Sequence, residues 1–137
     1  MTYTINESIR YFDDFLIYFA VALLLLVAFT IIYVKVTPYN EIALIRAGNT
    51  AAAISLSGAV LGFALPLAST VANAVNLVDL LLFALLATVV QLIVFVFARM
   101  VMPGLTASIE CGDIAKATFL AAVSVSVGML NAAALVF

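Results

Sequence analysis

The chain has 137 residues, of which 68% are hydrophobic and only 9% are charged, and its formal net charge is −2. Soluble domains carry about 25% charged residues and about 45–50% apolar residues, so this composition excludes a soluble globular domain. The chain contains no His and no Trp, one Cys, and only five Lys and Arg residues together. We therefore expect lipid to be its solvent and expect little catalytic or metal-binding chemistry.

Charged residues divide the chain into four long uncharged segments. An ionised side chain at the centre of a bilayer is costly, and a helix of about 20 apolar residues crosses the hydrocarbon layer, so each segment predicts a transmembrane helix. A β-barrel is excluded, because barrel strands alternate polar and apolar residues whereas residues 21–29 and 80–87 are apolar throughout. The prediction is one all-α integral membrane domain over residues 1–137, with an outer tail at 1–13 and transmembrane helices at 14–36, 50–73, 77–101 and 114–136.

Proline and capping residues indicate where these spans begin and end. The first span ends at Thr37-Pro38, because the residue before a proline is disfavoured in a helix. Asn49 and Asp113 are suited to cap the second and fourth spans at their N-termini. The third span stops ahead of Pro103.

The few cations predict the orientation of the chain. Lys35 and Arg46 flank the first connection and Arg99 and Lys116 flank the third, whereas Arg10 alone lies on the other side. By the positive-inside rule, both of these connections face the cytoplasm. We expect both termini to lie outside the cytoplasm.

An offset of 64 residues aligns similar residues in the two halves of the chain. Each half predicts a helical hairpin, over residues 14–73 and 77–137. Because an even number of spans separates the two copies, they form a parallel repeat rather than an inverted one. The aligned pairs are Lys35 with Arg99, Ile45 with Ile109, Gly48 with Gly112, and Ala51 with Ala115.

Small residues gather on one side of the second span, within an arc of about 80°. These residues are Ala51, Ser55, Gly58, Gly62, Pro66, Ser69 and Asn73. Bulky residues point away from this seam, which predicts that they face lipid; they are Leu56, Val60, Phe63 and Leu67. Gly58 and Gly62 form a GxxxG motif, which lets two helix backbones approach closely in lipid.

The fourth span repeats this pattern with Ala117, Ala121, Ser124, Gly128 and Ala132. The seams either assemble copies of the chain or pack inside one four-helix bundle. On both alternatives, the candidate packing and oligomerisation residues are Ser55, Gly58, Gly62, Pro66, Ser124 and Gly128.

Few polar side chains remain inside the predicted spans. Gln91 lies just past the centre of the third span, and a primary amide in hydrocarbon needs a partner. It either lines a pathway or forms a hydrogen bond between helices, worth about 1 kcal/mol. Asn131 lies nearer the outer surface, while Asp79 and Arg99 bracket the third span as anchors or as further pathway residues.

Motifs for catalysis are missing. We find no phosphate loop, dinucleotide fingerprint or metal-ligand spacing. Cys111 has no second cysteine for an intramolecular disulfide and no basic neighbour in sequence to activate it. We therefore expect no enzyme, no cofactor, no bound metal and no nucleic-acid partner.

The second half of the chain resembles a known family. Residues 48–69, which include Gly58, Gly62 and Pro66, are similar to the signature of the bacterial inner-membrane proteins grouped as domain of unknown function 350, the YjfL-like proteins. Asp79, Gln91, Arg99, Pro103, Gly128 and Asn131 resemble the same pattern in the same order. The resemblance covers residues 45–137 and implies a four-helix protein of the bacterial cytoplasmic membrane, of no established activity, associated with envelope-related gene neighbourhoods.

Two functions from different classes are consistent with these features. The first is a membrane interaction or scaffold module linked to the cell envelope, which assembles through its glycine seams with itself or with another membrane protein. The alternative is an oligomeric channel or transporter for an ion or small solute, with Gln91 and Asn131 along its path.

Overall fold

The computed structural model describes residues 2–73 and 76–135, and within these ranges the chain forms helices and short connections only. The helices are α1 (Thr2–Val36), α2 (Glu41–Arg46), α3 (Thr50–Asn73), α4 (Leu77–Val101), α5 (Leu105–Glu110) and α6 (Ile114–Ala134). Four of them, α1, α3, α4 and α6, are long and apolar enough to cross a membrane. The prediction of an all-helical chain with four membrane-spanning helices is therefore confirmed at this level.

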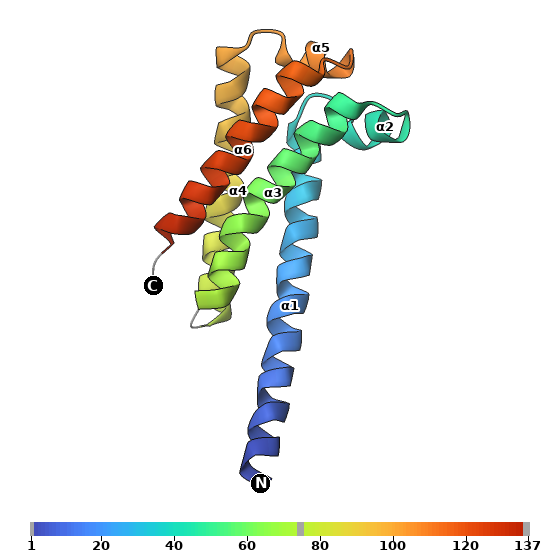
Figure 1. The fold of residues 1–137 in the computed structure, drawn as a ribbon. Coiled ribbons are helices and arrows are strands. Elements are labelled where there is room, and N and C mark those ends of the chain that lie inside the picture. The colour runs from blue at the N-terminus through green and yellow to red at the C-terminus, as the bar shows by residue number, and fades with distance from the viewer. Residues whose placement is uncertain (1, 74–75, 136–137) are drawn as a thin grey trace.

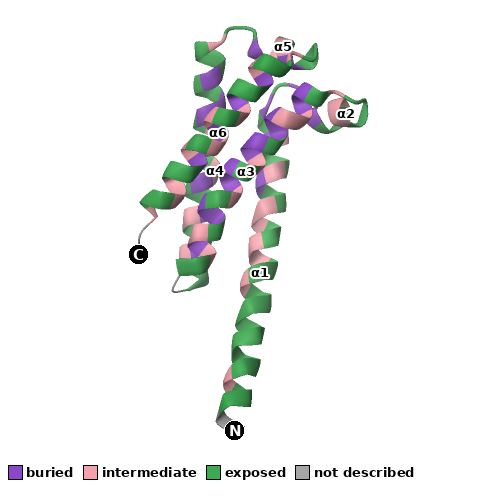
Figure 2. Cartoon of the chain, in the orientation of Figure 1, coloured by how far each residue is buried: buried purple, intermediate pink, exposed green. Residues whose placement is uncertain are grey.

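The long helices alternate in direction, so that α3 and α6 run the same way while α1 and α4 run the opposite way (Figure 1). The short helices α2 and α5 lie together at one end of the bundle (Figure 1). Helix α3 packs against α1, α4 and α6, and its most extensive contact is with α6. In the most apolar stretch of α3, 56% of the residues are buried, against 6% in that of α1 (Figure 2). Helix α3 is therefore the central helix and α1 the most peripheral one.

Helix α1 is one continuous helix of 35 residues. The described residues of the outer tail predicted at 1–13 continue this helix, and their place outside the membrane stays a prediction. No proline or glycine interrupts the chain before Pro38, so nothing breaks the backbone hydrogen bonding. At 1.5 Å per residue α1 is about 52 Å long, well above the ~30 Å of a bilayer core. Its N-terminal part projects past the other helices (Figure 1).

Side-chain caps mark the starts of three long helices. The Asn49 side chain accepts a hydrogen bond of 3.0 Å from the backbone N–H of Ala52, and that of Asp113 accepts one of 3.2 Å from Lys116. Asn76, which the sequence analysis did not single out, caps α4 in the same way. Each cap satisfies a backbone donor that the first helical turn leaves free. Residues 136–137, the end of the last predicted span and repeat, lie outside the described residues.

The connections before α3 and α6 contain helices that were not predicted. Helices α2 and α5 have six residues each. After each helix comes a glycine in the left-handed region, Gly48 with φ +89° and Gly112 with φ +88°, where a side chain would be strained. In sequence, Asn40 as a cap and Gly48 as a stop were the available signals for α2. The sequence identifies both segments only as connections between spans.

The bulky side of α3 is buried and does not face lipid, which corrects the prediction. Leu56, Phe63 and Leu67 are buried, and Val60 is half-buried. The Phe63 ring stacks on Phe29 of α1, with ring centroids 4.3 Å apart and an angle of 4° between the planes. The misassignment has a physical reason: a central helix buries two opposite sides, its small side against α6 and its bulky side against α1.

Candidate functional site

The glycine seam closes inside one chain, where α3 crosses α6. A Cβ atom added to Gly58 would overlap the backbone of Ala121, and one added to Gly128 would overlap the backbone of Gly62. Backbones can approach this closely only where the residues in contact have no side chain or a very small one. The sequence left two alternatives open for the seams, assembly of several copies and packing inside one four-helix bundle. These contacts are of the second kind, packing inside one chain.

Gln91 of α4 completes this crossing. Its side chain is 1% exposed, and its Nε2 donates a hydrogen bond of 3.1 Å to the backbone oxygen of Ser124. A Cβ atom on Gly62 would lie 2.6 Å from the same Nε2. The amide therefore occupies the space beside Gly62 and joins α4 to α6. Its Oε1 is buried and has no hydrogen-bond partner within the described ranges.

Further hydrogen bonds lie on either side of this crossing. Toward the end of α3, the Ser69 hydroxyl donates to the backbone oxygen of Ala132 of α6 at 3.1 Å. Just before α3, Asn49 Nδ2 donates to the backbone oxygens of Ile109 and Glu110 at the end of α5, at 3.0 and 3.1 Å. The contacts of Gly58, Gly62 and Ser69 follow the same order along α6, so α3 and α6 lie parallel.

The other candidate residues are not gathered at the crossing. Pro66 is buried on α3, and its carbonyl accepts a hydrogen bond from Thr70. Asn131 is half-buried, and its Nδ2 has no partner among the residues that the structure describes. Asp79 lies in the first turn of α4 and Arg99 in its last turn, with the Arg99 guanidinium 5.9 Å from the Phe95 ring centroid. The structure therefore does not assemble Gln91, Asp79 and Arg99 into one polar path within the chain.

Ser55 belongs to a buried polar cluster that sequence reasoning missed, located where α1, α2 and α3 meet. The Glu41 side chain is fully buried, although it is the first residue of α2. The Thr37 hydroxyl lies within hydrogen-bond distance of Glu41 Oε1 and also 3.1 Å from the backbone oxygen of Val34. On the adjacent side, the hydroxyls of Tyr39 and Ser55 form a hydrogen bond of 3.4 Å. We refer to Thr37, Tyr39, Glu41 and Ser55 as the Glu41 cluster.

Burial favours the neutral form of the Glu41 carboxyl group. The Thr37 hydroxyl donates to Glu41 Oε1, which satisfies one of the two carboxyl oxygens. The other carboxyl oxygen, Oε2, is buried without a partner in the described part of the chain, and an ionised carboxylate in this position would be costly.

The pKa values near this cluster follow from the same burial. Burial raises the pKa of Glu41 from its ordinary value of 4.5 to about 7, although the hydrogen bond from Thr37 lowers it. Burial likewise raises the pKa of Tyr39 to about 12, with the Ser55 hydrogen bond opposing the shift and Glu41 and Glu110 adding to it. A carboxyl group that titrates near neutral pH changes charge under ordinary cellular conditions. In sequence, Glu41 was indistinguishable from a solvated loop residue.

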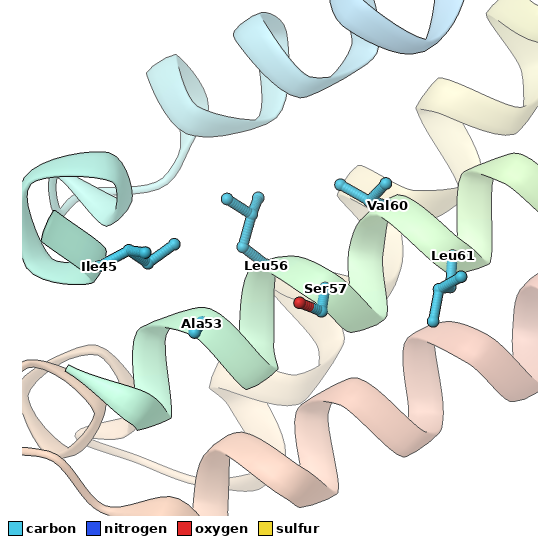
Figure 3. A pocket seen from close by; sticks show the side chains of 6 residues that line it. All are labelled: Ile45, Ala53, Leu56, Ser57, Val60 and Leu61. Atoms are coloured by element: carbon cyan, nitrogen blue, oxygen red, sulfur yellow. The ribbon is translucent and has the colours of Figure 1, made fainter. Parts of the chain in front are cut away.

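The outward side of α3 carries a strip of three residues between two surface hollows. This strip, Ala53, Ser57 and Leu61, lines both hollows, and we call it the outer strip of α3. One hollow, of about 470 Å³, lies toward α2 and is completed by Ile45, Leu56 and Val60 (Figure 3). The other, of about 520 Å³, lies toward α6. Both are open and mainly apolar, and neither Gln91 nor Asn131 lines them.

Four apolar spans around a glycine crossing define a multi-pass helical membrane protein. The chain belongs to the family described as Domain of Unknown Function (DUF350), whose model matches residues 5–135. It is 38% identical over 116 residues to the UPF0719 inner membrane protein YjfL of Escherichia coli K12, covering 85% of this chain and 88% of that protein. The protein of the same name from Escherichia coli O157:H7 is also 38% identical to this chain over 116 residues. No solved structure matches.

The family resemblance seen in the sequence is thus confirmed. The relatives and the four apolar helices together place the chain as a multi-pass protein of the inner membrane.

Proposed function

We propose that this protein is a non-catalytic membrane interaction module of the cell envelope that assembles with further copies of itself through the outer strip of α3. The observation that carries the proposal is the concave, small-residue surface formed by Ala53, Ser57 and the hollow on each side. The glycine seams are occupied within the chain, so assembly has to use another surface. A helix from a second copy can approach α3 here, because small residues allow close contact in lipid.

The bulky outward residues of α1 match this concave surface in character. Leu24, Val27 and Ile31 are exposed on α1, and side chains of this size are suited to fill hollows of several hundred Å³ on a second copy. The hydroxyl of Ser57 is exposed in the same strip and would gain a hydrogen-bond acceptor from the partner. Van der Waals packing and interhelical hydrogen bonds are the forces that associate helices in a bilayer.

Ser57→Leu should weaken assembly while the chain stays folded, because Ser57 is exposed and is not one of the residues that meet the glycines of the crossing. Overpacking of about 1–3 kcal/mol corresponds to a dissociation constant raised roughly 5- to 150-fold. The measurement is the concentration dependence of the oligomer mass in mild detergent, with helicity measured in parallel. Ser126→Leu is the matched control, since Ser126 is exposed on α6 and lines neither hollow. A wild-type monomer, or equal dissociation constants for both variants, contradicts the proposal.

The proposed orientation has both termini outside the cytoplasm. Lys35 and Arg46 lie on either side of the first connection, Arg99 and Lys116 on either side of the third, and α2 and α5 of these connections lie at one end of the bundle (Figure 1). The opposite end carries Arg10 alone among cations. The positive-inside rule then assigns the end with α2 and α5 to the cytoplasm.

Cys111 provides a direct test of this orientation, because it is exposed beside α5 and is the one cysteine of the chain. A membrane-impermeant maleimide should leave Cys111 unlabelled in intact cells and label it after lysis. In a Cys111→Ser background, Asn6→Cys on the exposed start of α1 should give the reverse pattern. Labelling of Cys111 in intact cells would place both termini in the cytoplasm.

We also propose that the chain consists of two copies of a parallel helical hairpin. In support, α2 and α5 begin 64 positions apart, as do α3 and α6. The backbone N–H of Gly48 bonds to Ile45, and that of Gly112 bonds to Ile109, both at 3.0 Å. The parallel directions of α3 and α6 agree with a repeat separated by an even number of spans.

The pathway alternative has weaker support. The atoms in its favour are Gln91 Oε1 and Asn131 Nδ2, which are buried and lack partners in the ranges described. Gln91, however, is almost completely buried and binds Ser124 through its other amide atom. A pathway would have to be created by assembly, so the assembly module is the function that we favour.

A further inference from the structure

A groove runs between α1 and the C-terminal half of α3, away from the outer strip. It consists of two adjoining hollows, of about 320 and 290 Å³, which share Phe19, Ala22 and Val71. The larger hollow is almost entirely apolar and is lined by leucines and alanines of both helices, such as Leu26 and Ala68. The smaller hollow is completed by Asp14 with the aromatic rings of Tyr11, Phe15 and Tyr18. The groove is thus apolar along one part and acidic and aromatic at its end.

The acidic end lies at the depth of lipid headgroups. Asp14 and Val71 line the same hollow, and Val71 is two residues before the end of α3 at Asn73. The exposed polar residues Asn73 and Asn76 follow at this level, so the hydrocarbon layer ends here. Toward the membrane centre the groove continues into the apolar hollow. A single molecule with a polar head and an alkyl chain fits this division.

The chemistry of the acidic end selects a cation. Asp14 is exposed, and no hydrogen bond or ion pair engages its side chain in the described part of the chain. The rings of Phe15 and Phe19 stack with their centroids 5.5 Å apart. A carboxylate next to aromatic rings attracts an ammonium group through charge and through the π faces, whereas it repels an anionic headgroup. Around Asp14, α1 carries two further acidic residues, Asp13 and Glu7, and one basic residue, Arg10. The resulting negative charge also disfavours an anionic headgroup.

We propose that this groove binds a zwitterionic phospholipid, with the headgroup ammonium beside Asp14 and one acyl chain in the apolar hollow. Phosphatidylethanolamine has the required primary ammonium group. The lipid is bound from the leaflet at the N-terminal end of the bundle, whichever side of the membrane that end faces. This site is independent of the assembly surface, because it shares no lining residue with the hollows beside the outer strip.

Native mass spectrometry of the full chain in mixed micelles tests the site, with phosphatidylethanolamine and phosphatidylglycerol of identical acyl chains in equal amounts. The wild type should retain phosphatidylethanolamine about five- to thirtyfold better, as expected for one desolvated cation-π and carboxylate contact. Asp14→Asn should remove this preference, and Asp14→Glu should keep it. Asp13→Asn is the matched control, since the neighbouring carboxylate lines neither hollow.

Three outcomes would overturn the proposal. One is equal retention of the two lipids by the wild type. The second is a preference that survives in Asp14→Asn or disappears equally in Asp13→Asn. The third is displacement of the lipid by soluble phosphoethanolamine at comparable concentration, because the headgroup alone would then account for binding and the apolar hollow would have no role.

Discussion

Gly62→Leu should leave little folded protein in the membrane. Even the first carbon of the new side chain would overlap the backbone oxygen of Ser124 and lie 2.6 Å from Gln91 Nε2, and neither a helix backbone nor a buried amide can move away cheaply. The variant would separate α3 from α6 and break the hydrogen bond from Gln91 to Ser124. Gly62→Ala should already lose about 1–3 kcal/mol of unfolding free energy, the usual cost of overpacking.

The measurement is the SDS concentration at which the helices unfold, compared with the wild type. Ser57→Leu is a matched control on the same helix, because Ser57 is exposed and should keep the wild-type midpoint. Equal midpoints for Gly62→Leu and the wild type would contradict the crossing of α3 and α6. Any change in oligomer mass for Gly62→Leu would report loss of the fold, whereas the change for Ser57→Leu would report assembly.

The stability of the wild type should decrease as the pH rises from 5 to 8. The pKa of Glu41 is raised from 4.5 to about 7 by burial, so the folded state binds more protons than the unfolded state in this interval. The stabilisation is complete below pH 4.5 and is lost as the pH rises through about 7. At 1.36 kcal/mol per pKa unit, the decrease between pH 5 and pH 8 is about 2–3 kcal/mol.

Glu41→Gln should remove most of this pH dependence, because an amide is neutral throughout and its oxygen can still accept the hydrogen bond from Thr37. Glu110→Gln is the control, since Glu110 is exposed on α5 and its replacement should leave the wild-type slope. Unfolding midpoints in SDS at a series of pH values provide the comparison. A slope that persists in Glu41→Gln would assign the titration to another group.

The spans and the crossing residues could be predicted because lipid imposes simple rules. Charges are excluded from the hydrocarbon layer, and small residues such as Gly58 and Gly62 mark close helix contacts. What the sequence could not decide was the partner of the seam, since Gly62 looks the same whether it meets α6 of its own chain or a helix of another copy. The bulky residue Phe63 was assigned to lipid for a related reason: lipid and α1 are equally apolar surroundings.

The Glu41 cluster was missed because its character depends on tertiary structure alone. Glu41 follows a proline and an asparagine, a context typical of an exposed turn. Its burial arises only when α2 folds back against α1 and α3, which brings Ser55 and Tyr39 to its side. No local pattern distinguishes this carboxyl group from Glu110, which occurs in the corresponding connection and is exposed.

The crossing of α3 with α6 has a consequence for how the chain is made. Helices α1 and α4 are the more apolar spans and α3 and α6 the less apolar ones, so α1 and α4 partition into lipid more readily by themselves. Helix α3 leaves the ribosome well before α6, and its glycine surface has no partner in this bundle until α6 is synthesised. The nascent protein therefore keeps an unfinished face in the membrane until α6 follows it, and α6 completes this contact.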